Sequence, residues 1–231
     1  MIVRFATTLV FLLVISSGIC ADPKIVQSMD VDFPVSGHVL VEVREEVGKF
    51  PQMIFSSQTT QKILLRSSIE DKERFLIPDA DNTEKITDMR FGLIRSNGFR
   101  GPMIMAVGIY RGGSDNAYFL TVFGEVGGRI VRLIEKPIFA NIQGGYYLGY
   151  LNKRLGYGLA VWNFIWETGA HYSEHKYEMD IYQLRANKLN RTLRRISRKA
   201  YDSDNGASSL SELGIKATDQ RKLIPIIKDS F

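Results

Sequence analysis

The segment HYSEH, residues 171–175, contains side chains that could bind a metal ion and take part in hydrolysis. Read as His-x-x-Glu-His, it matches the inverted signature of a zinc protease. In that arrangement His171 and His175 would bind one metal ion, and Glu174 would take part in hydrolysis. Such a site requires a helix, because one helical turn must bring both imidazoles to a common ion.

The residues around HYSEH predict a strand rather than this helix. Gly169 lies just upstream, and Tyr177, Met179 and Ile181 alternate with more polar residues just downstream. A third carboxylate ligand would have to come from further along the chain, where only Glu212 lies far enough away. We therefore expect a polar loop that enters a strand, and a metal-dependent hydrolase stays as the alternative from another functional class.

An acidic loop, DADNTEK at residues 79–85, is the other candidate metal site. Asp79 and Asp81 could supply oxygen ligands to calcium. The loop lacks the glycine and the closing acid that a calcium loop has at fixed spacing, and Asx turns account for the same residues. We expect a surface turn here, and no metal or cofactor in the protein.

Aromatic residues gather between positions 146 and 182, where seven of the ten tyrosines and both tryptophans lie. In residues 156–166 a period of two places Trp162, Phe164 and Trp166 on one face of a strand that is nearly apolar on both faces. Such a strand is expected at the centre of a sheet, with its rings in a core. The functional alternative is an exposed stacking surface for a sugar or a peptide. The candidate surface consists of Tyr146, Tyr147, Tyr150, Trp162, Trp166, His171 and Tyr172.

Strand patterns dominate the rest of the chain. Residues 38–45, HVLVEVRE, alternate, and glycine-rich turns separate the short apolar runs 103–110, 117–126 and 129–135. The sequence predicts an all-β fold, an antiparallel hairpin meander that forms propeller-like blades or a two-sheet sandwich, with a short helical C-terminal tail. Two blade-like units are expected, because Met105-Ala106-Val107 and Leu159-Ala160-Val161 occupy equivalent places about 54 residues apart.

The stretch YYLGYLNKRLGYGLAVWN, residues 146–163, resembles the repeat of integrin-alpha-like, FG-GAP-type β-propeller proteins. In that repeat a Gly-Asp-Leu-Asn run and an acidic calcium loop lead into an apolar strand. Gly149, Leu151 and Asn152 match the pattern, whereas Tyr150 stands in place of the first aspartate and Arg154 lies near a later acidic position. The resemblance implies blade-like units in which the acidic calcium loop is degraded.

The basic segment RANKLNRTLRRISRK, residues 185–199, has two interpretations. As a helix it would place an apolar stripe opposite arginines and favour an anionic surface. As the second strand of a hairpin, after a turn at Ala186-Asn187, it would be a charged sheet edge that prevents edge-to-edge aggregation. The strand that precedes it favours the hairpin.

The N-terminal residues predict an exported protein. Arg4, an apolar run and small residues form a signal peptide over residues 1–21, and cleavage after Cys20 would leave no cysteine. Without Arg4 the chain keeps 29 cations and 25 anions, a mild excess that does not favour nucleic-acid binding.

We expect three further parts, an N-terminal β part (22–78), the main antiparallel β region (79–201) and a C-terminal linker and tail (202–231). Within that tail, residues 202–209 are the linker, and Ser209 with Glu212 resembles a capping box.

These observations favour a non-catalytic binding or interaction protein of the cell envelope or extracellular space. The expected location is secreted or periplasmic, with a lipid anchor through Cys20 as the alternative. Glycans, peptides and envelope proteins are the candidate partners, nucleic acid is not expected, and the mature chain is expected to have no transmembrane helix. The other classes left open are the hydrolase and a purely structural envelope protein.

Overall fold

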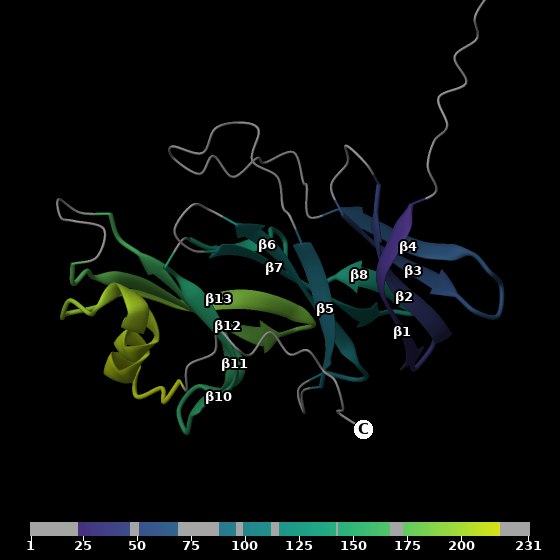
Figure 1. Cartoon of the computed structure of the whole chain (residues 1–231). Helices are drawn as coiled ribbons and strands as arrows, with labels where there is room; N and C mark the ends of the chain where they lie inside the picture. The colour runs from purple at the N-terminus through teal and green to yellow at the C-terminus, as the bar shows by residue number, and fades with distance from the viewer. Residues whose placement is uncertain are drawn as a thin grey trace, which may run out of the picture.

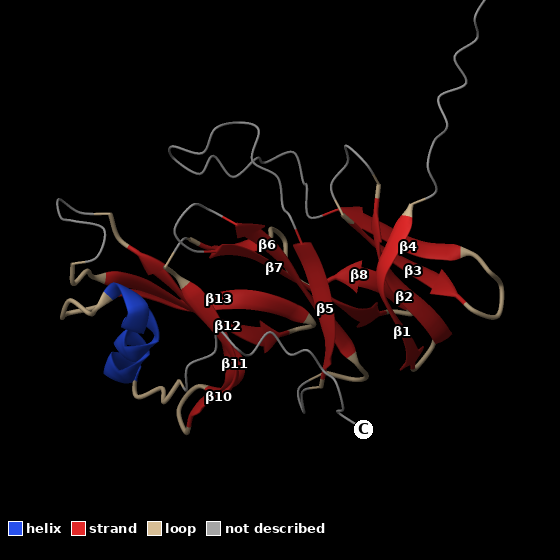
Figure 2. Ribbon diagram, in the orientation of Figure 1, coloured by secondary structure: helices blue, strands red, loops and turns tan. Residues whose placement is uncertain are grey.

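The computed structural model describes residues 23–46, 51–68, 88–95, 99–111, 116–141, 143–166 and 173–217. Within these residues the chain is all-β and antiparallel, with one short helix near its end (Figures 1 and 2). This confirms the fold class predicted from the alternating apolar pattern. No helix among the described residues is long and apolar enough to cross a membrane.

The strands form three consecutive antiparallel meanders, each made from one continuous stretch of chain. Sheet A contains β1 (Lys24–Phe33), β2 (Gly37–Glu45), β3 (Gln52–Ser57) and β4 (Ile63–Ser68). Sheet B contains β5 (Asp88–Ile94), β6 (Met103–Arg111), β7 (Asn116–Val126), β8 (Arg129–Arg132) and β9 (Ile138–Ala140), which also pairs with β7. Sheet C contains β10 (Gly145–Asn152), β11 (Gly156–Phe164), β12 (Tyr177–Arg185) and β13 (Lys188–Ile196).

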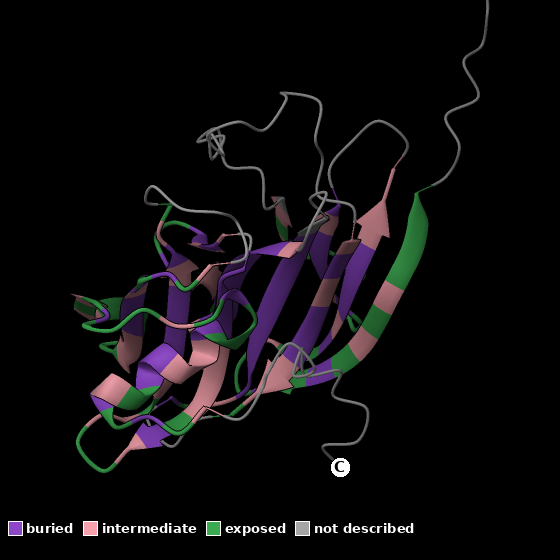
Figure 3. Ribbon diagram, turned by 60° about the vertical axis from the view of Figure 1, so that its left-hand side comes forward, coloured by how far each residue is buried: buried purple, intermediate pink, exposed green. Residues whose placement is uncertain are grey.

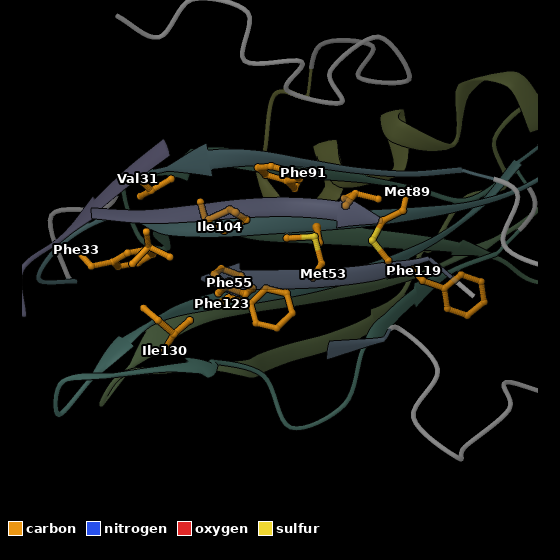
Figure 4. Packing of buried hydrophobic residues seen from close by; sticks show 14 of the residues in the cluster. Val31, Phe33, Met53, Phe55, Met89, Phe91, Ile104, Phe119, Phe123 and Ile130 are labelled. Atoms are coloured by element: carbon orange, nitrogen blue, oxygen red, sulfur yellow. The ribbon is translucent and has the colours of Figure 1, made fainter. Parts of the chain in front are cut away.

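The three sheets are stacked in the order of the sequence, and Figure 1 shows them from right to left as the colour runs from purple to green. Sheets A and B enclose the first core, in which Phe55 of sheet A lies 5.2 Å from Phe123 of sheet B, measured between ring centroids (Figure 4). The valines at alternate positions of β2 and the phenylalanines of β7 share this core because the period of two turns them to the same interface.

Sheet B is covered on both faces. Its second face packs against sheet C in another core, where Leu120 and Val122 of β7 meet Leu159 and Val161 of β11. The strand β7 is therefore buried at nine successive positions, Ala117 to Glu125, which explains its almost continuous apolar sequence. Figure 3 shows buried residues along the strands in the middle of the molecule, whereas β1, which follows the grey N-terminal trace, is exposed along most of its length.

A 3-10 helix, η1 (Ser203–Leu213), covers the outer face of sheet C. Asp202 caps its first turn by accepting a hydrogen bond from the N–H of Asp204, and Gly214 ends it in the left-handed conformation at φ 70°. Its buried positions include Ser203, Gly206 and Ser209, so small residues let the helix approach the sheet closely. A Cβ atom at Gly206 would lie 2.5 Å from a ring atom of Tyr177.

This helix corrects the prediction for residues 202–209, which are not a linker. The predicted capping box is also wrong, because Asp202 caps the helix and the Glu212 carboxylate accepts hydrogen bonds from residues outside the helix. The donors are the backbone N–H groups of Arg198 and Lys199 and the hydroxyl of Tyr201. Glu212 thereby fastens the loop that follows β13 to the helix.

A buried carboxylate joins sheets A and B at one end of their interface. Glu125, at the end of β7, accepts hydrogen bonds from the N–H of Val35 at 2.8 Å and from the N–H of Ser36 at 2.6 Å. The hydroxyl of Ser36 donates a third bond. The turn between β1 and β2 is therefore held to sheet B by one side chain that is 89 residues away from Ser36.

The hairpin interpretation of residues 185–199 is confirmed, since β13 is the outermost strand of sheet C and follows a two-residue turn. Ala186 and Asn187 both have positive φ, 49° and 61°, as a tight hairpin turn requires. The segments with the internal similarity become β6 and β11, the second strands of sheets B and C. The sequence did not predict strand β1, whose alternation is confined to Met29, Val31 and Phe33.

Candidate functional site

The HYSEH segment is not helical where the structure describes it. His175 forms an isolated antiparallel bridge with Tyr201, with backbone hydrogen bonds of 2.9 and 2.8 Å, just before β12 begins at Tyr177. This confirms the predicted loop that enters a strand.

The His175 side chain has structural contacts that account for its position. Its ring is 5% exposed, lies 4.1 Å from that of Phe164 between centroids, and its Nε2 is 3.1 Å from the hydroxyl of Ser173. His171, Asp79 and Asp81 lie outside the described residues. Among the residues that are described, no three histidine, cysteine or acidic side chains come together as metal ligands.

Two members of the predicted aromatic surface are buried, which corrects the prediction. Tyr146 is 4% exposed on the face of sheet C that meets sheet B, with its ring 5.6 Å from that of Tyr118. Burial is the main cause that raises the pKa of the Tyr146 hydroxyl, and the neighbouring Tyr118 adds to it. Trp162 is 3% exposed on the opposite face, under η1. At these two positions both faces of sheet C are covered, so neither ring can contact a partner.

The remaining described members do not form one surface either. Tyr147 is half-buried and donates a hydrogen bond to the backbone oxygen of Tyr150 at 3.1 Å. Tyr150 and Trp166 are exposed, at 50% and 57%, but Tyr150 is paired with the start of β11 and Trp166 lies beyond its end. Nine strand positions from Tyr157 to Trp166 correspond to about 30 Å. Tyr172 lies outside the described residues.

The structure places a different aromatic residue beside Tyr150. Tyr157 is directly opposite it across the β10–β11 hairpin, and the two rings make an edge-to-face contact at 5.4 Å. Tyr157 is 64% exposed, and it is not a member of the aromatic surface predicted from the sequence. The signal was available in the hairpin itself, because a turn centred on Lys153–Leu155 makes Tyr150 and Tyr157 cross-strand neighbours.

Tyr157 lines one end of a groove of about 230 Å³ between sheets B and C, and Tyr150 packs against Tyr157 at this end. At this end of the interface the fully buried Leu159 and Val161 give way to half-buried Leu148 and Leu184. Because fewer atoms cover these side chains, the two sheets leave an apolar opening between them. Its lining consists of Ile94, Arg95, Met103 and Val122 from the side of sheet B, and Leu148, Gly149, Tyr157, Gly158, Leu184 and Leu189 from sheet C.

Among the described residues that line the groove, Arg95 is the one that carries a charge. It is exposed just after the end of β5, and within the described part of the chain no carboxylate forms an ion pair with it. The groove therefore combines an apolar floor, a tyrosine rim and a single cation, the composition that small-ligand sites commonly have.

In a neighbouring cluster of charged residues on the same face of sheet C, the acidic and basic side chains pair with one another. Buried Asp180 accepts two hydrogen bonds from the guanidinium of Arg194, both 2.8 Å, and lies 3.5 Å from Arg191. Tyr182 also faces Asp180, and burial first, then this carboxylate, raises the pKa of the Tyr182 hydroxyl to about 12. Its phenol therefore stays protonated at neutral pH. These contacts fix β13 on β12 and leave no free charge for a ligand.

Comparison with known proteins gives no family for this chain. No protein family model matches the sequence, and neither a curated protein nor a solved structure matches it significantly. The resemblance of residues 146–163 to FG-GAP repeats therefore stays a prediction.

Proposed function

We propose that this protein is an exported, non-catalytic binding protein and that the groove between sheets B and C is its ligand site. The observation that carries the proposal is the exposed pair Tyr150 and Tyr157 at the mouth of an apolar groove. Exposed aromatic side chains beside an apolar opening are typical of a contact surface, because their rings bury a large area on binding.

The chemistry of the lining supports binding rather than catalysis. Among the described residues that line the groove, the titratable groups are Arg95 and Tyr157, and no carboxylate, histidine or cysteine accompanies them. A general acid–base pair or an activated nucleophile would need such a partner within hydrogen-bond distance. Export is proposed from residues 1–21, whose pattern is that of a signal peptide.

The test uses the mature protein and N-phenyl-1-naphthylamine, a neutral probe that fluoresces in apolar surroundings. We expect saturable binding to the wild type and its loss in Leu148→Trp, because the added indole fills the groove. Tyr157→Ala should weaken binding about five- to tenfold, since it removes one face of the rim. N-terminal sequencing of the exported chain should give a start next to Ala21.

The matched control is Trp166→Ala, which removes an equally exposed ring from the far end of β11. This variant should bind the probe as the wild type does. Unsaturable binding, or equal loss in Trp166→Ala and Tyr157→Ala, would show that the groove is not the site.

A further inference from the structure

We infer that the ligand of the groove is a small anionic amphiphile, with a single apolar chain and one negatively charged head such as a carboxylate. The inference rests on the proposed function and adds to it the chemical class of the ligand. Its basis is the contrast between an apolar groove floor and Arg95, a cation in the lining that has no acidic counterpart within the described residues.

The floor fits a short chain. Met103 and Val122 of sheet B face Leu148, Leu184 and Leu189 of sheet C, and all are apolar. A volume of about 230 Å³ corresponds to roughly seven or eight water molecules, and these would be released when a chain of comparable size enters. Transfer of such a chain from water is favourable by about 0.8 kcal/mol for each buried methylene group, so even a short chain gains affinity.

The mouth fits a negative head. Arg95 lies in the lining itself, and the turn that joins the two rim tyrosines contributes Lys153 and Arg154, both exposed. This turn has a defined shape, because the side-chain oxygen of Asn152 accepts hydrogen bonds from the N–H groups of Arg154 and Leu155 at 2.9 and 2.8 Å. The backbone of Lys153 and Arg154 therefore stays next to the rim tyrosines, while Arg95 is the cation that lines the groove itself.

The nearby cluster around Asp180 shows how arginines at this interface pair with a carboxylate. Arg194 binds Asp180 through two nitrogen atoms, and Arg191 shares the same carboxylate. Arg95 lies at the same interface between sheets B and C and has no acidic counterpart within the described residues. A guanidinium group forms its strongest hydrogen bonds with a carboxylate, so the missing partner is the one that the ligand would bring.

The test is calorimetric titration of the mature protein with three probes of equal chain length, namely decanoate, decanol and decyltrimethylammonium. We expect decanoate to bind at least about tenfold more tightly than decanol, and the cationic probe to bind most weakly. Arg95→Glu should weaken decanoate about tenfold or more, and it should weaken decanoate much more than decanol, so that the preference for the anion is lost. The control Arg66→Glu reverses an exposed charge on strand β4 of sheet A and should change neither affinity.

The outcomes separate this inference from the proposed function. If decanol binds as tightly as decanoate and Arg95→Glu has no effect, the inference of an anionic head is refuted, while the proposal that the groove is the binding site is retained. If no probe binds in the wild type, both proposals fail. If anionic vesicles bind the protein and Leu148→Trp does not weaken this binding, a flat membrane-surface interaction replaces the inference. Arg95→Gln repeats the charge test with a smaller perturbation, and thermal unfolding checks that each variant is folded.

Discussion

Replacing Glu125 with alanine should loosen the attachment of sheet A to sheet B. The carboxylate accepts three hydrogen bonds from Val35 and Ser36, and the side chain itself is buried. A hydrogen bond to a charged group contributes about 1.5–3 kcal/mol, and water can replace part of this in the turn because Val35 is exposed. We expect the free energy of unfolding to fall by about 2–4 kcal/mol, a large share of the usual 5–15 kcal/mol.

Urea unfolding followed by circular dichroism measures this loss, and the midpoint of thermal unfolding should fall on the order of 10 °C. Glu135→Ala is the matched control, since Glu135 is exposed, and it should change the free energy by no more than about 0.5 kcal/mol. Ser36→Ala alone should cost about 1 kcal/mol and should add little in the background of Glu125→Ala. Equal losses in Glu125→Ala and Glu135→Ala, or full additivity with Ser36→Ala, would show that the Glu125 carboxylate does not join the two sheets.

Two further predictions concern the C-terminal sheet. Burial opposes ionisation of Glu212, but hydrogen bonds from the N–H groups of Arg198 and Lys199 outweigh it and lower the pKa of Glu212 below its ordinary value of 4.5. The ionised form therefore stabilises the fold above that pH, and this contribution is lost as the pH falls through the folded-state pKa. Acid unfolding of Glu212→Gln should consequently be less steep than that of the wild type, and identical profiles would contradict this. Ala186→Asn should raise the free energy of unfolding by about 0.5–1 kcal/mol, because asparagine tolerates the left-handed conformation at φ 49° better than alanine does. Ala186→Val should lower it in the same urea titration, and the opposite order would exclude this explanation.

The period of two was enough to predict the inner strands of the fold. Residues 38–45 and 156–166 form strands at internal positions of their sheets. The second segment is apolar on both faces, and this correctly predicted that a layer covers each face. The turn at Ala186-Asn187 also decided correctly between helix and hairpin for the basic segment. Each of these features is local in sequence, so its signal does not depend on the rest of the fold.

Features that depend on distant parts of the chain were missed. Strand β1 is an outer strand with mostly exposed residues, so only its last positions alternate. The burial of Trp162 depends on η1, whose polar and small residues resemble a linker. The helix needs a small residue at Gly206, because this position lies against Trp162 and Tyr177, where a larger residue would not fit. A pattern of hydrophobicity does not reveal a cover made of glycine and serine.

Only part of the candidate site could be predicted from the sequence. Tyr150 was selected correctly as an exposed residue, whereas its partner Tyr157 required the hairpin register. The floor of the groove comes from strands of two sheets, and Arg95 and Tyr157 are 62 positions apart in the sequence. Side chains that far apart meet only after the sheets have packed.

The order of the layers along the chain has a consequence for how the protein is made. Because each meander is one continuous stretch of chain that lies on the meander before it, a chain emerging from its N-terminus can add layers in order without threading back through an earlier one. Shortening the chain from the C-terminus would remove first the helix and then sheet C, and each removal would leave one apolar face open to water. Sheets B and C are both apolar on two faces, so neither of these layers could stand alone without its neighbours.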